Sequence, residues 1–381
     1  MQQVFTVILV LLILLASGCG TMNNVERTAV GAGLGVELDN ENNVLFYAQF
    51  NRPVNVQETG ANEAQSEVFV GRGKTPSQAA RNITLVMPHL PLWSHADIFV
   101  LGEKLARTDL YYMADFLSRN RNVRKNSFMV VASKVSPYDI FTGECPFALC
   151  TSRGIINILQ AQEKQFGIYV LVTASEFITK LLSYGIDPVA PQVTIVKKDG
   201  KSIITIDGMA VFRQNRMVGS LNELECRGYR WLSPTSKKDG LVVLSAPWPG
   251  VDYISLEVNE FNTRTRPRMA GGKLIMDVKV DVTVHLIDVG GVVNVLESED
   301  IIEDLAAQEI ERQIRACINK AQQLNSDILG WGQKIHRYEP GVWETLEPLW
   351  YDVYPDIEAQ VAVQANLRGQ RQLVNPLSNR R

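Results

Sequence analysis

A nearly continuous apolar run at the start of the chain constrains where the rest of it can fold. Val4 to Leu15 reads VFTVILVLLILL, with Thr6 as its one polar residue, and it is shorter than the roughly 20 residues that a transmembrane helix needs. A run of this kind followed by small residues is typical of a secretory signal peptide. No later stretch of about 18 apolar residues occurs, so we expect the remainder to fold outside the membrane.

The residues after this run predict a lipid anchor. Ala16, Ser17 and Gly18 are small enough to enter a signal peptidase groove, and Cys19 follows directly. Its thiol can be alkylated with diacylglycerol and then become the new N-terminus, and two acyl chains give stable anchoring. We predict a lipoprotein signal peptide at residues 1–18, lipid attachment at Cys19 and a polar tether at residues 19–27. The alternative is an ordinary signal peptide or signal anchor with an incidental cysteine.

Length and charge bound the remaining possibilities. The chain has 381 residues, so the mature part is long enough for two or three domains. Its hydrophobic content of 46% and charged content of 21% are ordinary for globular domains. A net charge of -3 gives no reason to expect nucleic-acid binding.

The other cysteines give two separate expectations. Cys145 and Cys150 flank four residues in a predicted loop, close enough to form a disulfide in an oxidising exterior. Spacing alone does not supply the required geometry, so both the bridged and the free form stay open, with the free form favoured. Cys226 and Cys317 lie among apolar residues in helical patterns, where we expect buried free thiols.

Strand-like and helix-like patterns alternate through the first half of the chain. Two apolar runs joined by Asp39–Asn43 predict a β-hairpin. Thr75 and Pro76 form a typical helix start, with Thr as the N-cap and Pro in the first turn. The alternation indicates α/β layers, which we assign to an N-terminal domain at residues 28–190. Its predicted strands are 28–38, 44–50, 68–70, 97–101 and 128–133, and its later helices are 103–118, 155–164 and 175–184.

Two proline-rich breaks divide the rest of the chain. Residues 187–191 (DPVAP) and 246–250 (APWPG) interrupt the regular patterns. We therefore predict a middle domain at residues 191–250 and a C-terminal α/β domain at residues 251–368. A basic tail at residues 369–381 is expected to be mobile.

The C-terminal domain is predicted to hold long strands and one long helix. The strands cover residues 253–261 and 273–289, with a final strand at 357–367. The helix covers residues 299–323, and its apolar face repeats at steps of three and four. We expect a multi-domain α/β (α+β) fold, in which helices flank mixed and antiparallel sheets.

Motifs that suggest nucleotide binding have the wrong spacing. Gly73, Lys74 and Thr75 suggest a phosphate-binding loop, but Val68 stands where that motif needs a glycine, and Pro76 removes a backbone donor. The glycine cluster from Gly31 to Gly35 has no preceding strand and no following helix. We expect it to be a set of close-packed glycines in the first strand.

Catalytic and metal-binding patterns are missing as well. The four histidines, of which the nearest two are His89 and His95, are not spaced as zinc ligands. The chain has no Gly-x-Ser-x-Gly nucleophile elbow. We predict that the protein is not an enzyme and that it uses no metal and no cofactor.

Two clusters leave an alternative open. The acidic residues Glu299, Asp300, Glu303 and Asp304 suggest a cation site, but a charge-matched helix N-terminus is the favoured interpretation. The late aromatic residues suggest a ligand cage, but core and docking contacts are favoured. They are Trp331, Tyr338, Trp343, Trp350, Tyr351 and Tyr354.

Two segments of the second half resemble a known family. Gly208–Gly219 (GMAVFRQNRMVG) and Glu225–Leu232 (ECRGYRWL) are similar to the G-x-A-V-F, V-G, E-T-R-G and W-L patterns of the Ger(x)C family, with Cys226 in place of the usual Thr. Lys320–Gly332 (KAQQLNSDILGWG) is similar to the family's A-Q and D-I-F-G-F-G patterns. The family's H-R pair and paired tryptophans match His336, Arg337, Trp343 and Trp350. The first half resembles the family more loosely.

The resemblance implies a function that the motifs above do not. Ger(x)C proteins are the lipoprotein C subunits of bacterial spore germinant receptors. The resemblance therefore implies a three-domain α/β protein without enzyme activity, lipid-anchored at Cys19 to the outer face of the spore inner membrane. Its implied partners are the integral-membrane A and B subunits, which sense nutrients. The main alternative is an extracytoplasmic solute-binding lipoprotein that holds a small ligand between domains.

Overall fold

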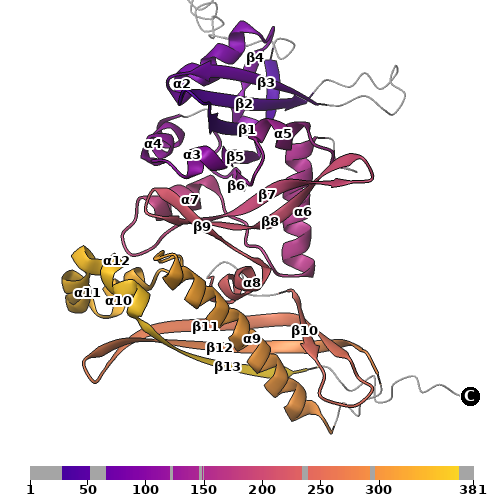
Figure 1. Ribbon diagram of the computed structural model, residues 1–381, viewed down its shortest axis with the longest axis vertical. Helices are drawn as coiled ribbons and strands as arrows, with labels where there is room; N and C mark the ends of the chain where they lie inside the picture. The colour runs from indigo at the N-terminus through magenta and orange to yellow at the C-terminus, as the bar shows by residue number, and fades with distance from the viewer. Residues whose placement is uncertain are drawn as a thin grey trace, which may run out of the picture.

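Two sheets follow one another along the long axis of the molecule (Figure 1). The computed structural model describes residues 28–51, 66–120, 123–145, 148, 150–233, 239–291 and 297–368. The predicted signal peptide, Cys19, the tether and the basic tail lie outside these ranges. Mixed sheets, flanking helices and a long C-terminal helix confirm the predicted fold class.

The first sheet has a parallel centre and antiparallel ends. Strands β1, β5, β6 and β7 run parallel, whereas β1–β2–β3 and β7–β8–β9 are antiparallel. The short β4 lies beside the first residues of β1. In spatial order the strands are β3 (Ser66–Gly73), β2 (Val44–Asn51), β1 (Thr28–Leu38), β5 (Ile98–Gly102), β6 (Phe128–Ala132), β7 (Val189–Lys198), β8 (Lys201–Arg213) and β9 (Arg216–Leu221), with β4 (Leu90–Leu92) off this path.

This sheet crosses the boundary that we predicted near residue 190. Strand β7 begins at Val189, pairs with β6 through Gln192 and Val193, and pairs with β8 along its whole length. A break at residue 191 would cut through these ladder hydrogen bonds. Residues 191–221 therefore extend the first sheet and do not begin a separate one. The other domain limits stay a prediction.

Helices cover both faces of the first sheet because its central apolar residues alternate in direction. Ile98 and Val100 of β5 pack against α5 and α6, whereas Phe99 and Leu101 face the side of α2, α3, α4 and α7. The helices are α2 (Pro76–Asn82), α3 (Glu103–Ala106), α4 (Tyr111–Arg119), α5 (Pro137–Thr142), α6 (Thr151–Gln165) and α7 (Ala174–Leu181), with 3₁₀ turns η2 (Ile83–Leu85) and η3 (Trp93–His95).

The prediction of one continuous helix over residues 103–118 is wrong, because the structure has two separate helices there, α3 and α4. Asp109 interrupts the helix by accepting the Tyr111 backbone N–H (2.8 Å) and the Asn215 side-chain amide (2.7 Å). The Leu110 N–H donates to the Asn215 carbonyl at 3.0 Å. The turn between β8 and β9 thus supplies hydrogen bonds that compete with a continuous helix.

The second sheet carries the long helix on one face. Strand β12 and helix α9 have the bounds that we predicted, and the apolar side of α9 is buried. Three short helices follow α9 in the chain and lead into the last strand, which pairs parallel with β12. The elements are α8 (Glu223–Leu232), β10 (Leu241–Ser245), β11 (Tyr253–Ala270), β12 (Lys273–Val289), α9 (Glu299–Gln323), α10 (Trp331–Tyr338), α11 (Pro340–Leu346), α12 (Trp350–Val353) and β13 (Glu358–Leu367), with 3₁₀ turns η4 (Glu347–Leu349) and η5 (Tyr354–Asp356).

Helices α8 and α9 touch backbone to backbone at a glycine. A Cβ atom at Gly228 would collide with the Gln313 carbonyl oxygen and lie 2.7 Å from Cβ of Cys317. Three residues on, the Trp231 indole N–H donates to the Gln313 side chain at 2.8 Å. Cys226 and Cys317 are fully buried free thiols in this contact, which confirms the prediction for both.

Replacing this glycine should separate the two helices. We expect Gly228→Ala to lower the free energy of unfolding by about 1–3 kcal/mol, because the added methyl group has no space without a backbone shift. Urea unfolding followed by circular dichroism measures the change. Gly341→Ala in α11 is the matched control, since nothing lies within 4 Å of its added Cβ. Equal stabilities of the two variants would contradict the close-contact argument.

Candidate functional site

A pair of buried carboxylates joins the first sheet to the helices of the second. Asp187 precedes β7, and Asp327 lies between α9 and α10; both are almost completely inaccessible. The Asp327 N–H donates to Oδ2 of Asp187 at 2.7 Å, and the Asp187 N–H donates to the Asp327 carbonyl at 2.8 Å. The Tyr351 hydroxyl donates to Oδ1 of Asp187 at 2.9 Å. We call these three residues the carboxylate joint.

Backbone donors occupy the remaining oxygens of the carboxylate joint. Oδ1 and Oδ2 of Asp327 accept the N–H groups of Trp331 and Gly332, each at 2.9 Å, at the first turn of α10. Oδ1 of Asp187 also accepts the Gln214 N–H at 2.6 Å, from the turn that precedes β9. Because every oxygen has a donor inside the protein, the pair is built to hold loops together.

Burial dominates the electrostatics of the joint. It raises the pKa of Asp327 to about 7, even though the N–H groups of Gly332 and Trp331 lower it and the charge of Asp187 adds to the rise. Burial also raises the pKa of Asp187, against the hydrogen bonds from Gln214 and Tyr351. Two carboxyl groups with raised pKa values suit general acid–base chemistry. Here, however, both are sealed from substrate by the elements that they connect.

Two glycines let the sheets approach at the joint. A Cβ on Gly332 would lie 2.5 Å from Cα of Gly185, and one on Gly185 would lie 2.7 Å from the carbonyl carbon of Gly332. Gly330 adopts a left-handed conformation with φ 65° at the start of α10, which glycine tolerates without a steric penalty. The segment from Asp327 to Gly332 therefore has a physical reason for its acid and for both of its glycines.

The late aromatic residues pack beside this joint. Trp331, Trp343, Trp350 and Tyr354 are buried, and the ring centroids of Trp343 and Trp350 lie 5.2 Å apart in an edge-to-face arrangement. Trp350 and Tyr354 lie 5.6 Å apart. These contacts confirm the core interpretation for these four residues. Tyr338 differs, because it is exposed, with the Arg266 guanidinium over its ring.

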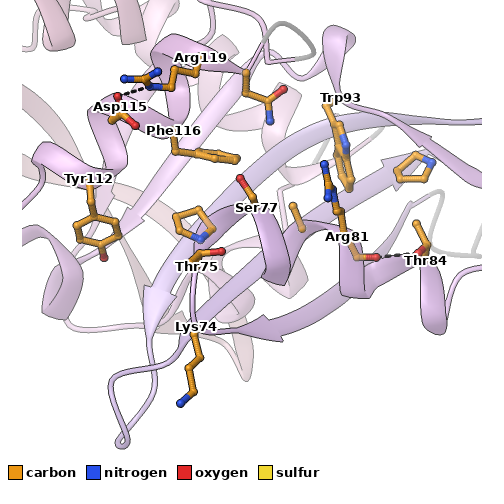
Figure 2. Close-up of a pocket in the computed structure, with 14 residues that line it drawn as sticks. Lys74, Thr75, Ser77, Arg81, Thr84, Trp93, Tyr112, Asp115, Phe116 and Arg119 are labelled. Carbon is orange, nitrogen blue, oxygen red and sulfur yellow. Dashed lines mark hydrogen bonds and ion pairs between the residues drawn. The ribbon is translucent and has the colours of Figure 1, made fainter.

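A groove opens at the other end of the molecule, between α2 and α4. Figure 2 shows Lys74, Ser77 and Arg81 on its α2 side, and Phe116 and Arg119 on its α4 side. The groove encloses about 760 Å³ and has Trp93 along its wall. We call it the apex groove. Its lining residues include three basic side chains and one carboxylate, Asp115, which is paired with Arg119 at 2.6 Å, so the groove favours anionic groups.

The structure resolves several open points from the sequence. Cys145 and Cys150 are both free thiols. Thr75 caps α2 by accepting the Gln78 N–H at 3.2 Å, as predicted. A Cβ on Gly33 would collide with Oγ of Ser152 and lie 2.9 Å from Phe141, which confirms close packing in the first strand.

The acidic cluster at the start of α9 acts as part of the helix. Glu303 accepts the backbone N–H of Leu367 at 2.6 Å and so holds the end of β13. Within the described residues, no group of three or more His, Cys, Asp or Glu side chains is placed to hold a metal ion. No described helix has the length and hydropathy to cross a bilayer.

Sequence reasoning missed the carboxylate joint and the apex groove. Asp187 was noted only as part of a proline-rich break, and Asp327 only as a letter in a motif. These two residues lie 140 positions apart in the chain, so no local sequence pattern links them. The local sequence signal that could have indicated the joint was Asp327, which is followed within five residues by two glycines near an aromatic cluster.

Removing the hydroxyl of the joint tests how much it contributes. We expect Tyr351→Phe to lower the free energy of unfolding by about 1–2 kcal/mol, because a buried carboxylate oxygen loses a donor. Tyr253→Phe is the matched control, since its hydroxyl binds Asp288 at the surface; a change within about 0.5 kcal/mol is expected there. Urea unfolding measures both, and equal losses would refute a special role for Tyr351.

The raised pKa of Asp327 predicts a pH dependence. Its folded pKa of about 7 lies above its ordinary 3.8, so folding takes up a proton between these values. The free energy of unfolding should therefore fall as the pH rises from about 4 to about 7. Asp327→Asn removes the titrating carboxyl group. The free energy of unfolding of the natural protein, relative to that of the variant, should therefore decrease over the same pH window. Urea unfolding at several pH values measures it, and a constant difference would rule it out.

Comparisons with known proteins cover both halves of the chain. Residues 22–195 match the family described as the spore germination protein N-terminal domain, and residues 207–370 match the family described as spore germination B3/GerAC like, C-terminal. Their separation between residues 195 and 207 lies within strands β7 and β8.

Individual relatives agree over nearly the whole length. Spore germination protein KC of Bacillus subtilis (strain 168) is 25% identical, with 98% of this chain and 97% of that protein covered. Putative spore germination protein YfkR of the same organism is 22% identical over 70% of this chain and 69% of its own. The crystal structure of the GerBC protein has a TM-score of 0.58 at 17% identity, covering 88% of this chain and 97% of that chain, and so shows a similar fold. With both halves matched, the chain belongs to the Ger(x)C family of spore germination proteins.

Proposed function

We propose that this protein is the lipid-anchored C subunit of a spore germinant receptor complex, needed for nutrient-triggered germination. The observation that carries the proposal is the match to the spore germination families over both halves of the chain. The apolar leader that ends in Ala16-Ser17-Gly18-Cys19 supports the anchor. Its site of action is the outer face of the spore inner membrane, beside the integral-membrane A and B subunits.

The role is one of assembly and signalling. Lipidation at Cys19 confines the protein to two dimensions and raises its effective concentration near membrane partners. Weak interfaces with the A and B subunits then suffice to hold the complex together. The architecture suits this role because the carboxylate joint ties the two sheets into a fixed relation.

A non-enzymatic role agrees with the chemistry of the joint. Asp187 and Asp327 both have raised pKa values, and their oxygens accept hydrogen bonds from Tyr351 and from backbone N–H groups. A general acid or base must reach the proton that it transfers. These carboxylates are instead committed to internal contacts.

Removing the acylated thiol tests the anchor and the function together. We expect Cys19→Ala to shift the protein from the membrane to the soluble fraction of spores, and to slow nutrient-triggered germination. Fractionation with immunoblotting measures the first effect, and the loss of optical density after nutrient addition measures the second. Cys145→Ala is the matched control, since it removes a free thiol from the described fold. Normal membrane retention of Cys19→Ala would refute the anchor.

A further inference from the structure

Five exposed apolar side chains belong to β1, β4 and the turn that follows α2, at the end of the molecule that also holds the apex groove. Leu85, Val86 and Leu90 are 80%, 63% and 55% exposed, and Val30 and Leu92 are exposed as well. We call Val30, Leu85, Val86, Leu90 and Leu92 the apolar apex. Exposed apolar residues that gather in one place mark an interaction surface more often than scattered ones do.

The apolar apex lies where the described chain begins. Strand β4 pairs with the first residues of β1, so that Leu90 lies beside Thr28 and Leu92 beside Val30. Leu85 and Val86 directly follow α2 in the chain, and α2 and β4 both lie in the upper part of Figure 1. Thr84 and Pro91 both line the apex groove, which places η2 and β4 around one depression.

The fold presents these side chains rigidly. Ile83 and Met87 flank Leu85 and Val86 in the chain and are buried in the core of the first sheet. The N–H groups of Val86 and Met87 both donate to the Ile83 carbonyl at 3.1 Å. The exposed pair is therefore pinned on both sides, and its outward direction is a property of the fold.

The length of the chain before Thr28 identifies what this surface meets. Eight residues lie between Cys19 and Thr28, and the nine steps from Cys19 to Thr28 span about 30 Å when the chain is fully extended. A lipid on Cys19 thus holds the apolar apex within reach of the bilayer, whereas β10 to β13 lie at the far end of the long axis (Figure 1).

The charges next to the apolar apex suit a bilayer with anionic headgroups. Arg81 lies in the last turn of α2, about one turn before Leu85, and lines the apex groove beside Trp93, whereas Lys74 lies at the other end of α2 and points away from Trp93 (Figure 2). Asp115, the carboxylate among the lining residues, is already paired with Arg119. Basic residues near apolar ones attract anionic lipids and add to the binding of the apolar part.

We propose that the apolar apex inserts into the bilayer that carries the Cys19 lipid, with Arg81 facing anionic headgroups. This inference rests on the proposed anchor and adds a second contact to it. Lipid and apex together fix which end of the protein faces the membrane and hold the second sheet away from it.

Site-specific labels on the lipidated full-length mature chain test the insertion. Leu85→Cys and Val243→Cys, each made in a Cys145→Ser background, receive an environment-sensitive nitrobenzoxadiazole label; Val243 is an exposed residue of β10. Flotation with phosphatidylglycerol-containing vesicles first establishes that the protein is anchored. We then expect blue-shifted emission and quenching by spin-labelled lipids at position 85, and an aqueous spectrum at position 243. A protein that floats but keeps an aqueous spectrum at position 85 overturns the insertion while leaving the anchor intact.

Vesicle binding without the lipid separates the two claims further. The mature chain with Cys19→Ser should still bind phosphatidylglycerol vesicles weakly, and Leu85→Ser with Leu90→Ser should weaken that binding by about tenfold. Leu182→Ser with Val243→Ser is the control, because these residues are 58% and 52% exposed and lie outside the apolar apex, after α7 and in β10. Arg81→Gln should reduce binding to anionic vesicles only. Equal binding of the apex and control variants overturns the proposal. A blue shift of the label at position 85 that occurs only when another receptor subunit is present overturns it as well.

Discussion

The exchange of hydrogen bonds between Asp187 and Asp327 is the constraint on which the arrangement of the two sheets depends. Each residue donates its backbone N–H to an oxygen of the other. A buried carboxylate that lost its donors would leave a desolvated polar group, which costs far more than an exposed hydrogen bond contributes. The loops around residues 185–188 and 326–332 can therefore form only together. The relation between the sheets is set by polar chemistry as well as by apolar packing.

This constraint accounts for the residues around the joint. Asp327 must present two oxygens to the first turn of α10, so the chain has to reverse direction within a few residues of α9. Gly330 permits that reversal through its left-handed backbone, and Gly332 lets α10 meet Gly185 without a Cβ between them. The buried tryptophans then fill the space beside these glycines. A motif that reads as a family signature is thus a set of geometric requirements.

The sequence predicted those parts of the fold that depend on local periodicity. The bounds of α9 and β12 were correct because long runs repeat with a constant period and end at clear polar breaks. The interruption between α3 and α4 was not predictable, because the Asn215 groups that stabilise it lie about a hundred residues away. The first sheet crossed the expected boundary at residue 190 for a similar reason. Pro188 and Pro191 break a local pattern, but β7 is placed by its pairing with β6 and β8.

The candidate surfaces were less predictable than the fold, and the reason is physical. Leu85, Val86 and Leu90 are apolar residues, as are the neighbouring Ile83 and Met87, which are buried. Only the three-dimensional fold separates the side chains that point inward from those that point outward. The fold also places the outward-facing residues of β4 beside the first residues of β1, which follow the predicted lipid site in the chain. The apolar leader in the sequence and the exposed apolar residues in the fold are therefore two independent features that favour the same membrane-facing end.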